Sequence, residues 1–187
     1  FIKFIKIVNK MAKKNIILVT GGAGFVGTNL IKFFLKKTKY KLISLDNYSS
    51  GRKLNHIKSS RVKYLKGKTV NISSIIKNPK QIKSVFHFGE FARIYQSFLK
   101  MNECIDSNNV GSNAVFSFCL KNNIKLIYSA TSASLGNKGN DKNLSPYAFS
   151  KSKNLELLEN LKKWFNFKYE VIYFYNVYGP HQICKGQ

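Results

Sequence analysis

The sequence contains no uninterrupted stretch of about 18 apolar residues, the length that a membrane-spanning helix needs, so we expect no transmembrane segment. Cysteine is scarce: Cys104, Cys119 and Cys184 are odd in number, widely spaced and not accompanied by histidine at metal-ligand spacing. This pattern argues against a disulfide framework and against a zinc site. It is typical of buried thiols in the reducing environment of the cytoplasm, and no metal is expected.

Acidic residues are also scarce, since 8 Asp and Glu stand against 32 Lys and Arg, for a formal net charge of +24. Such a balance by itself indicates a polyanionic partner such as nucleic acid. However, the only arginines are Arg52, Arg61 and Arg93, and the lysines are scattered along the whole chain. No zinc-finger, helix-turn-helix or RNA-recognition pattern accompanies the charge, so we predict no nucleic-acid partner.

The three histidines give no sign of a metal site either. His87 ends an apolar run and is interpreted as a core residue. His56 and His181 have no second metal-type residue at ligand spacing and are interpreted as surface residues without a function.

A chain of 187 residues with 44% hydrophobic content is long enough to bury the core of one globular domain. Residues 1–10 alternate apolar pairs with lysine, and Met11 stands where a natural start is expected, just before the first predicted strand. We expect residues 1–10 to be an extraneous or disordered segment; a basic segment lying on an anionic membrane is the alternative. Residues 11–187 are expected to form the domain.

Short apolar runs alternate with helical patterns along the chain. Residues 15–20 and 41–46 are typical of buried strands, and residues 25–37 between them carry apolar side chains at helical spacing. Further strands are predicted at 62–65, 84–88, 125–130 and 169–173, and helices at Ile105–Lys121 and Pro146–Phe165. This order indicates an α/β fold with a doubly wound parallel sheet of the Rossmann type, in three α/β/α layers.

A glycine-rich segment joins the first predicted strand to the first predicted helix. Residues 21–27 read GGAGFVG, and glycines at such a turn allow a tight bend and let a pyrophosphate approach the helix N-terminus. Asp46 follows about 20 residues later, at the end of the second predicted strand, where a carboxylate accepts hydrogen bonds from the adenosine ribose. A carboxylate there repels a 2′-phosphate, so the sequence predicts a dinucleotide site that favours NAD over NADP.

Tyr147 and Lys151 are one helical turn apart in the segment YAFSK. They therefore share a face of the predicted helix, where the ammonium can stabilise a phenolate. A tyrosine stabilised in this way can exchange a proton with a substrate. In a chain with 10 tyrosines and this much lysine the spacing also arises by chance, so an ordinary pair of helix residues is the alternative.

Several segments together resemble the extended short-chain dehydrogenase/reductase family, in its NAD-dependent epimerase/dehydratase branch, and especially its UDP-glucose 4-epimerase-like sugar-nucleotide epimerases. The segments are TGGAGFVG at 20–27, VFHFG at 85–89, YSATSASLG at 128–136, LSPYAFSK at 144–151 and NVYGP at 176–180. The resemblance extends over residues 15–187 and implies a Rossmann-like fold with an NAD cofactor.

The resemblance also implies roles for particular residues. Tyr147 is implied to take the proton of a sugar hydroxyl, Thr131 to share that hydrogen bond, and Lys151 to hold the nicotinamide ribose. The implied cofactor-binding residues are Gly21, Gly24, Phe25, Val26, Gly27, Asp46, Asn47, Phe88, Gly89, Asn108 and Lys151. The implied substrate-binding residues are Thr131, Tyr147 and Asn176.

Three places depart from the family pattern. Lys68 stands where the family usually has an aspartate that contacts the adenine amino group. Gly89 and Glu90 replace a small pair after His87, and Tyr173 replaces an arginine. These changes bear on the adenine contacts and on packing near the substrate, whereas the residues implied in hydride transfer are retained.

The residues after the fifth predicted strand narrow the implied reaction. Dehydratases and decarboxylases of the family usually carry an acid at the position of Ala133. With alanine there, the simplest chemistry is reversible oxidation at C4 of a nucleotide sugar, as in epimerisation of a UDP-hexose. A reductase or dehydratase of the same family, and a non-catalytic NAD-binding module, are the alternatives.

Two expectations concern the whole protein. Family members continue past the NVYGP segment into a region that supplies much of the sugar-nucleotide pocket, so residues 11–187 are expected to be the NAD-binding domain without most of that region. Family enzymes commonly pair through two long helices, here Ile105–Lys121 and Pro146–Phe165, so a cytoplasmic homodimer is expected.

Overall fold

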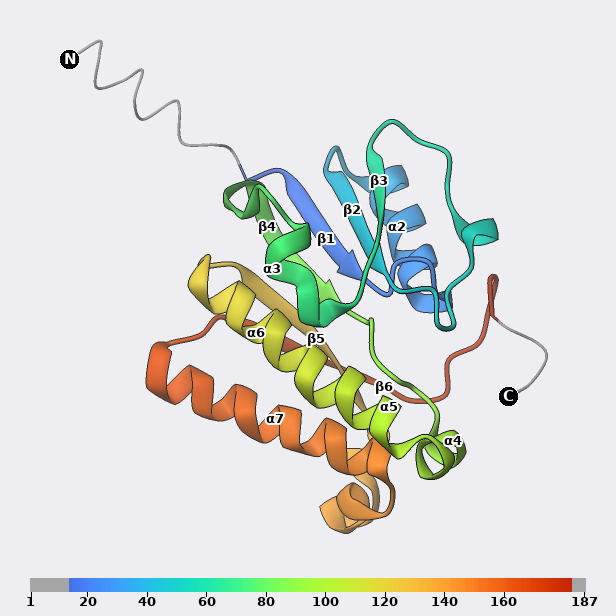
Figure 1. Cartoon of the computed structure of the whole chain (residues 1–187), viewed down its shortest axis with the longest axis vertical. Helices are drawn as coiled ribbons and strands as arrows, with labels where there is room; N and C mark the ends of the chain where they lie inside the picture. Colours follow the sequence, from blue (N-terminus) through green and yellow to red (C-terminus); the bar gives the residue numbers. More distant parts are fainter. Residues whose placement is uncertain (1–13, 183–187) are drawn as a thin grey trace.

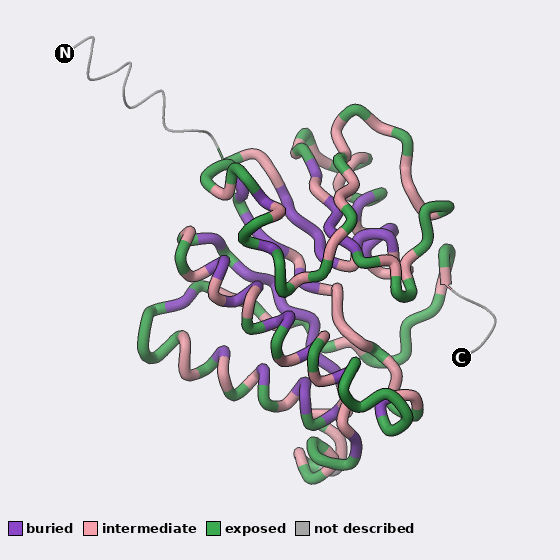
Figure 2. Tube along the Cα trace, in the orientation of Figure 1, coloured by how far each residue is buried: buried purple, intermediate pink, exposed green. Residues whose placement is uncertain are grey.

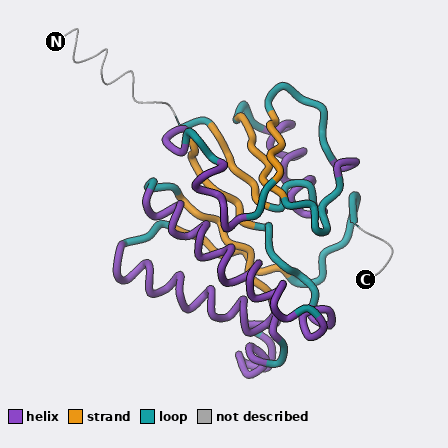
Figure 3. The backbone as a smooth tube through the Cα atoms, viewed as in Figure 1, coloured by secondary structure: helices purple, strands orange, loops and turns teal. Residues whose placement is uncertain are grey.

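A computed structural model describes residues 14–182 of the chain, apart from the side chain of Asn137. The segment 1–10 and Cys184 lie outside the described residues. Six parallel strands form one sheet in the order β3-β2-β1-β4-β5-β6, shown in orange in Figure 3. The strands are β1 (Ile16–Thr20), β2 (Lys41–Asp46), β3 (Val62–Lys66), β4 (Ile82–His87), β5 (Lys125–Thr131) and β6 (Tyr169–Phe174).

Helices cover both faces of the sheet. They are α2 (Phe25–Lys37), α3 (Ile72–Ile75), α4 (Ile94–Leu99), α5 (Met101–Ile105), α6 (Gly111–Lys121) and α7 (Pro146–Phe165). Figure 1 shows α3, α6 and α7 on one face of the sheet and α2 on the other. The predicted three-layer, doubly wound α/β fold is therefore confirmed.

Side chains of each strand alternate between the two faces. Both faces are buried in the central strands β1, β2, β4 and β5, whereas the edge strands β3 and β6 are partly exposed. In β1, Leu18 packs with the α6 and α7 side, whereas Ile17 and Val19 pack with α2. Figure 2 shows the buried residues concentrated along the strands and the inner sides of the helices. Because the central parallel strands are covered on both faces, they are rich in consecutive apolar residues, and this is why the sequence predicted them clearly.

The predicted elements agree with the observed ones at most ends, with three differences. The predicted helix Ile105–Lys121 is the second part of a longer helical run, in which α5 and α6 are joined by a π-helical turn at Asp106–Val110. The strand β4 begins earlier than predicted, because Ile82 already pairs with Ile16 of β1. The short helices α3 and α4 were not predicted.

One stretch of the sheet stays open on the α2 side among the described residues. An apolar groove lies there between α2 and β6, and its lining includes Phe25, Val26, Phe88 and Phe174. Phe88 and Phe174 contact each other edge to face, with ring centroids 5.8 Å apart. The side chains of Phe25 and Val26 thus face this groove, while their backbone opens helix α2.

Candidate active site

The strand order places a crevice at the carboxyl ends of β1 and β4. In the sheet, β2 and β3 lie on one side of β1, toward one edge. The later strands β4, β5 and β6 lie on the other side of β1, toward the opposite edge. Connections from the two strands leave on opposite faces, and ligands of such sheets bind in the gap that this creates. The predicted glycine turn and the segment after His87 both lie at this point.

The glycine turn brings backbone close to backbone. Gly21 has φ +69°, a left-handed conformation that favours glycine, and its N–H donates to the Leu45 carbonyl at 2.8 Å. A Cβ on Gly21 would lie 2.8 Å from Phe88 and Gly89 backbone atoms, and a Cβ on Gly27 would lie 2.3 Å from the Gly21 carbonyl oxygen. The backbone thereby leaves no room for a side chain at Gly21 or at Gly27.

Helix α2 starts directly after this turn. Its N-cap, Gly24, supplies no side-chain hydrogen bond, and the first turn of the helix contains no acidic residue. The first backbone N–H groups and the positive end of the helix dipole are therefore available for an anion. Close backbone and an uncapped helix N-terminus are the two features that a dinucleotide pyrophosphate needs.

Asp46 lies beside the turn at the end of β2. Its carboxylate accepts the N–H of Ala23 at 2.9 Å and the N–H of Tyr48 at 2.8 Å, and the residue is only 6% exposed. A Cβ on Gly51 would lie 2.8 Å from both carboxylate oxygens, so this wall of the site is also backbone. The carboxylate is held in one orientation and keeps lone pairs for ribose hydroxyls. Neighbouring Asn47 accepts the Ser49 N–H at 2.9 Å.

On the other side of the crevice, Tyr147 and Lys151 lie at the start of α7. Ser145 caps this helix by accepting the Ala148 N–H at 3.0 Å, and Pro146 occupies its first position. The cap fixes where the helix begins, and so it places Tyr147 and Lys151 on successive turns. Tyr147 is half-buried, and its N–H donates to Ser97 Oγ at 3.3 Å.

Thr131 ends β5 at the same edge of the sheet. It is 7% exposed, and its hydroxyl accepts the Ala133 N–H at 3.3 Å where the chain turns into a 3-10 helix, Ser132–Ser134. Helix α7 packs against this turn. The three residues implied to be catalytic therefore come from two adjacent elements at one edge of the sheet.

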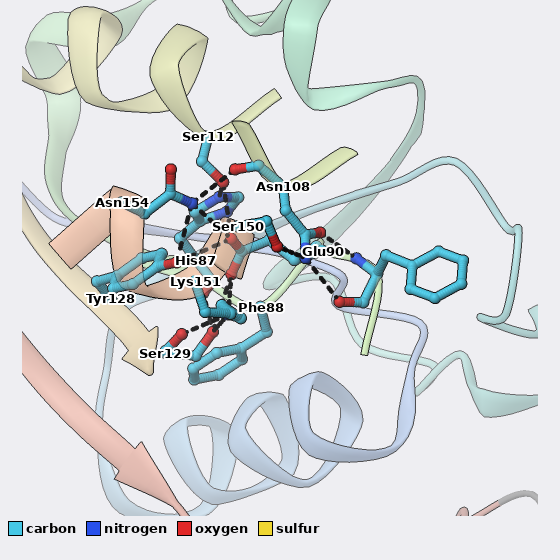
Figure 4. A network of polar contacts seen from close by, with 12 residues as sticks. His87, Phe88, Glu90, Asn108, Ser112, Tyr128, Ser129, Ser150, Lys151 and Asn154 are labelled. Atoms are coloured by element: carbon cyan, nitrogen blue, oxygen red, sulfur yellow. Dashed lines mark hydrogen bonds and ion pairs between the residues drawn. The ribbon is translucent and has the colours of Figure 1, made fainter. Parts of the chain in front are cut away.

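Lys151 is buried, and its ammonium group pairs with a residue that the sequence did not single out as functional. The Lys151 side chain is 4% exposed and forms an ion pair with Glu90, whose side chain is 2% exposed. The ammonium also donates to the Ser129 carbonyl and lies 4.8 Å from the ring centroid of Tyr128. Figure 4 shows these side chains converging from β5, α7 and the loop after β4.

Glu90 is the centre of a network of hydrogen-bond donors. Its Oε1 accepts Ser112 Oγ at 2.8 Å, Tyr128 Oη at 3.0 Å and Asn154 Nδ2 at 3.3 Å. Burial by itself raises the pKa of Glu90, but the Lys151 ammonium and the hydrogen bond from Ser112 hold that pKa below its usual value. Glu90 is therefore a buried carboxylate rather than a carboxylic acid.

His87 connects this network to the glycine turn. Thr20 Oγ1 accepts the N–H groups of Phe88 at 3.2 Å and Gly89 at 3.0 Å, so its own proton points to His87 Nδ1 at 2.6 Å. The proton of the imidazole is then on Nε2, which lies 2.8 Å from Ser112 Oγ. Burial lowers the pKa of His87 to about 4, and the imidazole is neutral. This is the core histidine that the sequence predicted.

Asn108 supports the loop after β4. Its Oδ1 accepts the Phe91 N–H at 2.6 Å, and its Nδ2 donates to the Phe91 carbonyl and to Ser150 Oγ, both at 3.0 Å. The side chain is fully buried, so it shapes the crevice by fixing the 88–92 loop against α7. Asn176 is exposed and lies beyond β6. The assignment of both residues to ligands stays a prediction.

The residues that sequence reasoning missed are Glu90, Ser129 and Asn154. Two features of the sequence could have drawn attention to Glu90. It stands where the family usually has a small residue, and it is an acidic residue just after an apolar strand. His56 was interpreted as a surface residue; it is half-buried, stacked on Tyr64 with ring centroids 3.8 Å apart. Among residues 14–182 no cluster of three or more His, Cys, Asp or Glu is arranged to hold a metal ion.

Cys104 and Cys119 are buried free thiols, as expected. Burial raises the pKa of both thiols. In the part of the chain that the structure describes, no helix combines the length and apolarity that crossing a membrane requires.

Comparison with known proteins identifies relatives of this chain. The sequence profile of the NAD dependent epimerase/dehydratase family matches residues 17–186. The structure of a UDP-N-acetylglucosamine 4-epimerase from Methanobrevibacter ruminantium, in complex with UDP-N-acetylmuramic acid, is similar with a TM-score of 0.81 and 26% identity. That alignment covers 93% of this chain and 59% of the epimerase chain.

Two further solved structures are similar. UDP-glucose 4-epimerase from Thermotoga maritima, with UDP-glucose, has a TM-score of 0.78 and 26% identity over 91% of this chain and 59% of its own. UDP-glucose 4-epimerase from Thermus thermophilus, in complex with NAD, has a TM-score of 0.80 and 23% identity over 92% of this chain and 58% of its own. The chain thus spans less than two thirds of these relatives, and the fold is shared with all three.

Proposed function

Because the chain belongs to the NAD-dependent epimerase/dehydratase family, we propose that it is the cofactor-binding portion of a nucleotide-sugar 4-epimerase. The observation that carries the proposal is the arrangement of Tyr147, Lys151 and Thr131 at the same edge of the sheet as the glycine turn. NAD is the cofactor of the family, in agreement with the expectation from Asp46. The similar structures solved with UDP-sugars support a UDP-hexose as the substrate class.

The residues of the crevice fit NAD. The 21–27 turn has no room for side chains at Gly21 and Gly27 and leads into an uncapped helix, so it suits the pyrophosphate. Asp46 suits the adenosine ribose hydroxyls, and its negative charge disfavours a 2′-phosphate. When bound, NAD supplies the hydride acceptor and donor of the reaction.

The catalytic residues act on the proton of the sugar hydroxyl. Tyr147, as a phenolate, accepts this proton and later returns it, and Thr131 donates a hydrogen bond to the same sugar oxygen. Lys151 supplies positive charge one helical turn from Tyr147, and the ammonium proton that is not donated to Glu90 or to the Ser129 carbonyl is assigned to the nicotinamide ribose. Asn176, at the carboxyl end of β6, is assigned to the sugar diphosphate.

The absence of a second acid near Thr131 favours epimerisation over dehydration. The residues after Thr131 are Ser132, Ala133 and Ser134, which carry no carboxyl group. Glu90 does not replace one, because its carboxylate is buried and already bonded to Lys151, Ser112 and Tyr128. Elimination of water needs an additional acid and base, whereas oxidation and re-reduction at one carbon does not.

We also propose a homodimer that pairs through the helices expected from the sequence, Ile105–Lys121 and Pro146–Phe165, the second of which is α7. Phe149, Trp164 and Phe165 of α7 are 42%, 63% and 59% exposed, and Tyr95 and Phe98 of α4 are 76% and 57% exposed. Large apolar side chains that stay exposed on a monomer are typical of a protein interface. A sedimentation measurement that gives a monomer at micromolar concentration would contradict the dimer.

The function is tested on the purified protein in two steps. Nucleotide is extracted and identified, and the protein is then incubated with UDP-glucose and with UDP-galactose while the products are separated. NAD release with interconversion of the two sugars supports the epimerase, and Tyr147→Phe serves as the inactive control. Accumulation of a keto-sugar or of reduced cofactor would favour a reductase or dehydrogenase, and NAD without turnover of either sugar would favour a different substrate or the non-catalytic alternative.

A further inference from the structure

The buried ion pair between Glu90 and Lys151 has a consequence for cofactor binding. Its two side chains are 2% and 4% exposed, so solvent does little to screen their charges. The pair as a whole carries no net charge. His87, which is linked to Glu90 through Ser112, adds no charge, because burial lowers its pKa to about 4 and the imidazole is neutral.

The pair lies on the nicotinamide side of the crevice. Asp46 and the glycine turn occupy the ends of β2 and β1, so they take the adenosine and pyrophosphate parts of a dinucleotide lying across the switch point. The remaining half of the dinucleotide then lies toward the ends of β4 and β5. Glu90 follows β4 directly, and Lys151 donates to the Ser129 carbonyl in β5.

The charge of the nicotinamide ring changes with its oxidation state. The ring is a cation in the oxidised form and neutral in the reduced form. A buried ammonium without a counter-charge would repel the cationic ring and have little effect on the neutral one. A carboxylate paired with that ammonium offsets its charge, so the oxidised and the reduced ring are no longer bound with different affinity for this reason.

We propose that Glu90 sets the redox preference of this site, because its negative charge offsets Lys151 and so preserves affinity for the oxidised cofactor. This inference rests on the proposed NAD-binding function. Glu90 is a positioning residue: it orients the ammonium through the ion pair, and the Ser112, Tyr128 and Asn154 donors fix the carboxylate in turn. An enzyme that takes hydride from a sugar and returns it benefits from a site in which both oxidation states bind well.

The test compares dissociation constants rather than turnover. Binding of NAD⁺ and of NADH is titrated separately for the wild type and for Glu90→Gln, and the ratio of the two Kd values is the readout. Loss of the carboxylate charge is expected to raise Kd(NAD⁺)/Kd(NADH) by about tenfold, the order of magnitude for one charge acting on another within such a crevice at an effective dielectric constant of about 20.

Three further variants separate charge from packing. Glu90→Asp keeps the charge and disturbs the contacts, so its ratio should remain within about threefold of the wild type. The double variant Glu90→Gln with Lys151→Met removes both charges and should bring the ratio back toward the wild-type value. Glu156→Gln removes an exposed acid of α7, paired with Lys153 at 2.7 Å, and should leave the ratio unchanged.

The outcomes are distinguishable. If Glu90→Gln weakens both forms equally and the ratio stays constant, Glu90 acts only through packing and the inference is wrong. If Glu90→Gln does not fold, Glu90→Ala removes the same charge without burying an amide, and the same rise in ratio is required of it. A wild-type protein that binds neither form would overturn the proposed function itself, and the inference with it.

Discussion

Gly27 offers a direct test of how closely the backbone of the glycine turn is packed. A Cβ at this position would lie 2.3 Å from the Gly21 carbonyl oxygen, 2.7 Å from Gly22 Cα and 2.9 Å from the Gly21 carbonyl carbon. All three are backbone atoms, so no side chain can rotate out of the way. Gly27→Ala therefore requires the turn itself to move, by about 1 Å to restore ordinary van der Waals contact.

The expected cost follows from the contacts that hold the turn. The Gly21 oxygen accepts the Gly24 N–H at 3.1 Å, and moving it sacrifices a hydrogen bond worth about 1 kcal/mol. Overpacking a rigid site costs a further 1–3 kcal/mol or so. We expect Gly27→Ala to lower the free energy of unfolding by roughly 2–4 kcal/mol, or the melting temperature by roughly 4–16 °C for a domain of this size.

Gly24→Ala is the matched control, because it makes the same change in the same turn. Its Cβ would lie 3.3 Å from the Gly21 oxygen, and Gly24 has φ −80°, which any residue adopts. We expect a change in stability within about 1 kcal/mol. Thermal unfolding of both variants without added nucleotide measures the difference, and equal melting temperatures for Gly27→Ala and Gly24→Ala would refute the reasoning.

Three further predictions concern the site. Tyr147→Phe should lower turnover by roughly 10²–10⁴-fold while the Kd for NAD stays within a few-fold of the wild type, as measured by kinetics and cofactor titration. Asp46→Asn, which keeps the shape and removes the charge, should narrow the preference for NAD over NADP in the same titration. His87 is neutral in the folded protein down to a pKa of about 4, against 6.5 in the unfolded chain, so its contribution to stability is complete above pH 6.5 and lost as the pH falls toward 4. Between pH 6.5 and pH 4, the free energy of unfolding measured by denaturant titration should fall by about 3 kcal/mol more for the wild type than for His87→Gln. If the free energies of unfolding of the two proteins change with pH in parallel, the prediction is wrong.

The parts of the fold that local chemistry dictates were predicted from the sequence. The strand and helix patterns, the GGAGFVG turn and the cap and proline at the start of α7 all depend on residues near one another in the chain. Asp46 was found for the same reason, since its position follows from the length of the β-α-β unit. These features need only periodicity, turn chemistry and a known crossover length.

The polar network around Lys151 could not be predicted in this way. Glu90 and Lys151 are 61 residues apart in sequence, and neither the acid nor the lysine shows from its neighbours that it is buried. Asn108 likewise fixes the backbone of Phe91 only because the π-helical turn and the 88–92 loop meet in space. Such contacts depend on the packing of β4, β5 and α7 against one another, and one sequence carries no pattern for that.

The same network explains how a glutamate can occupy a position where a small residue is usual. A buried carboxylate is destabilising unless hydrogen bonds and an opposite charge compensate its loss of hydration. Here Ser112, Tyr128 and Asn154 donate to one oxygen and Lys151 pairs with the other. Among the described residues the one buried side-chain polar atom without a hydrogen-bond partner is Ser44 Oγ, which lies outside this network.

The hydrogen bonds that stabilise Glu90 also connect the two sides of the crevice. The backbone N–H groups of Phe88 and Gly89 orient Thr20, Thr20 fixes the tautomer of His87, and His87 through Ser112 orients the Glu90 carboxylate. Each hydrogen bond in the series leaves the next group only one orientation, because a hydroxyl has a single proton. The glycine turn at the end of β1 and the ammonium on α7 are thus parts of one hydrogen-bonded structure. A small residue in place of Glu90 would remove the link between them, so the glutamate couples the geometry of the glycine turn to the position of Lys151.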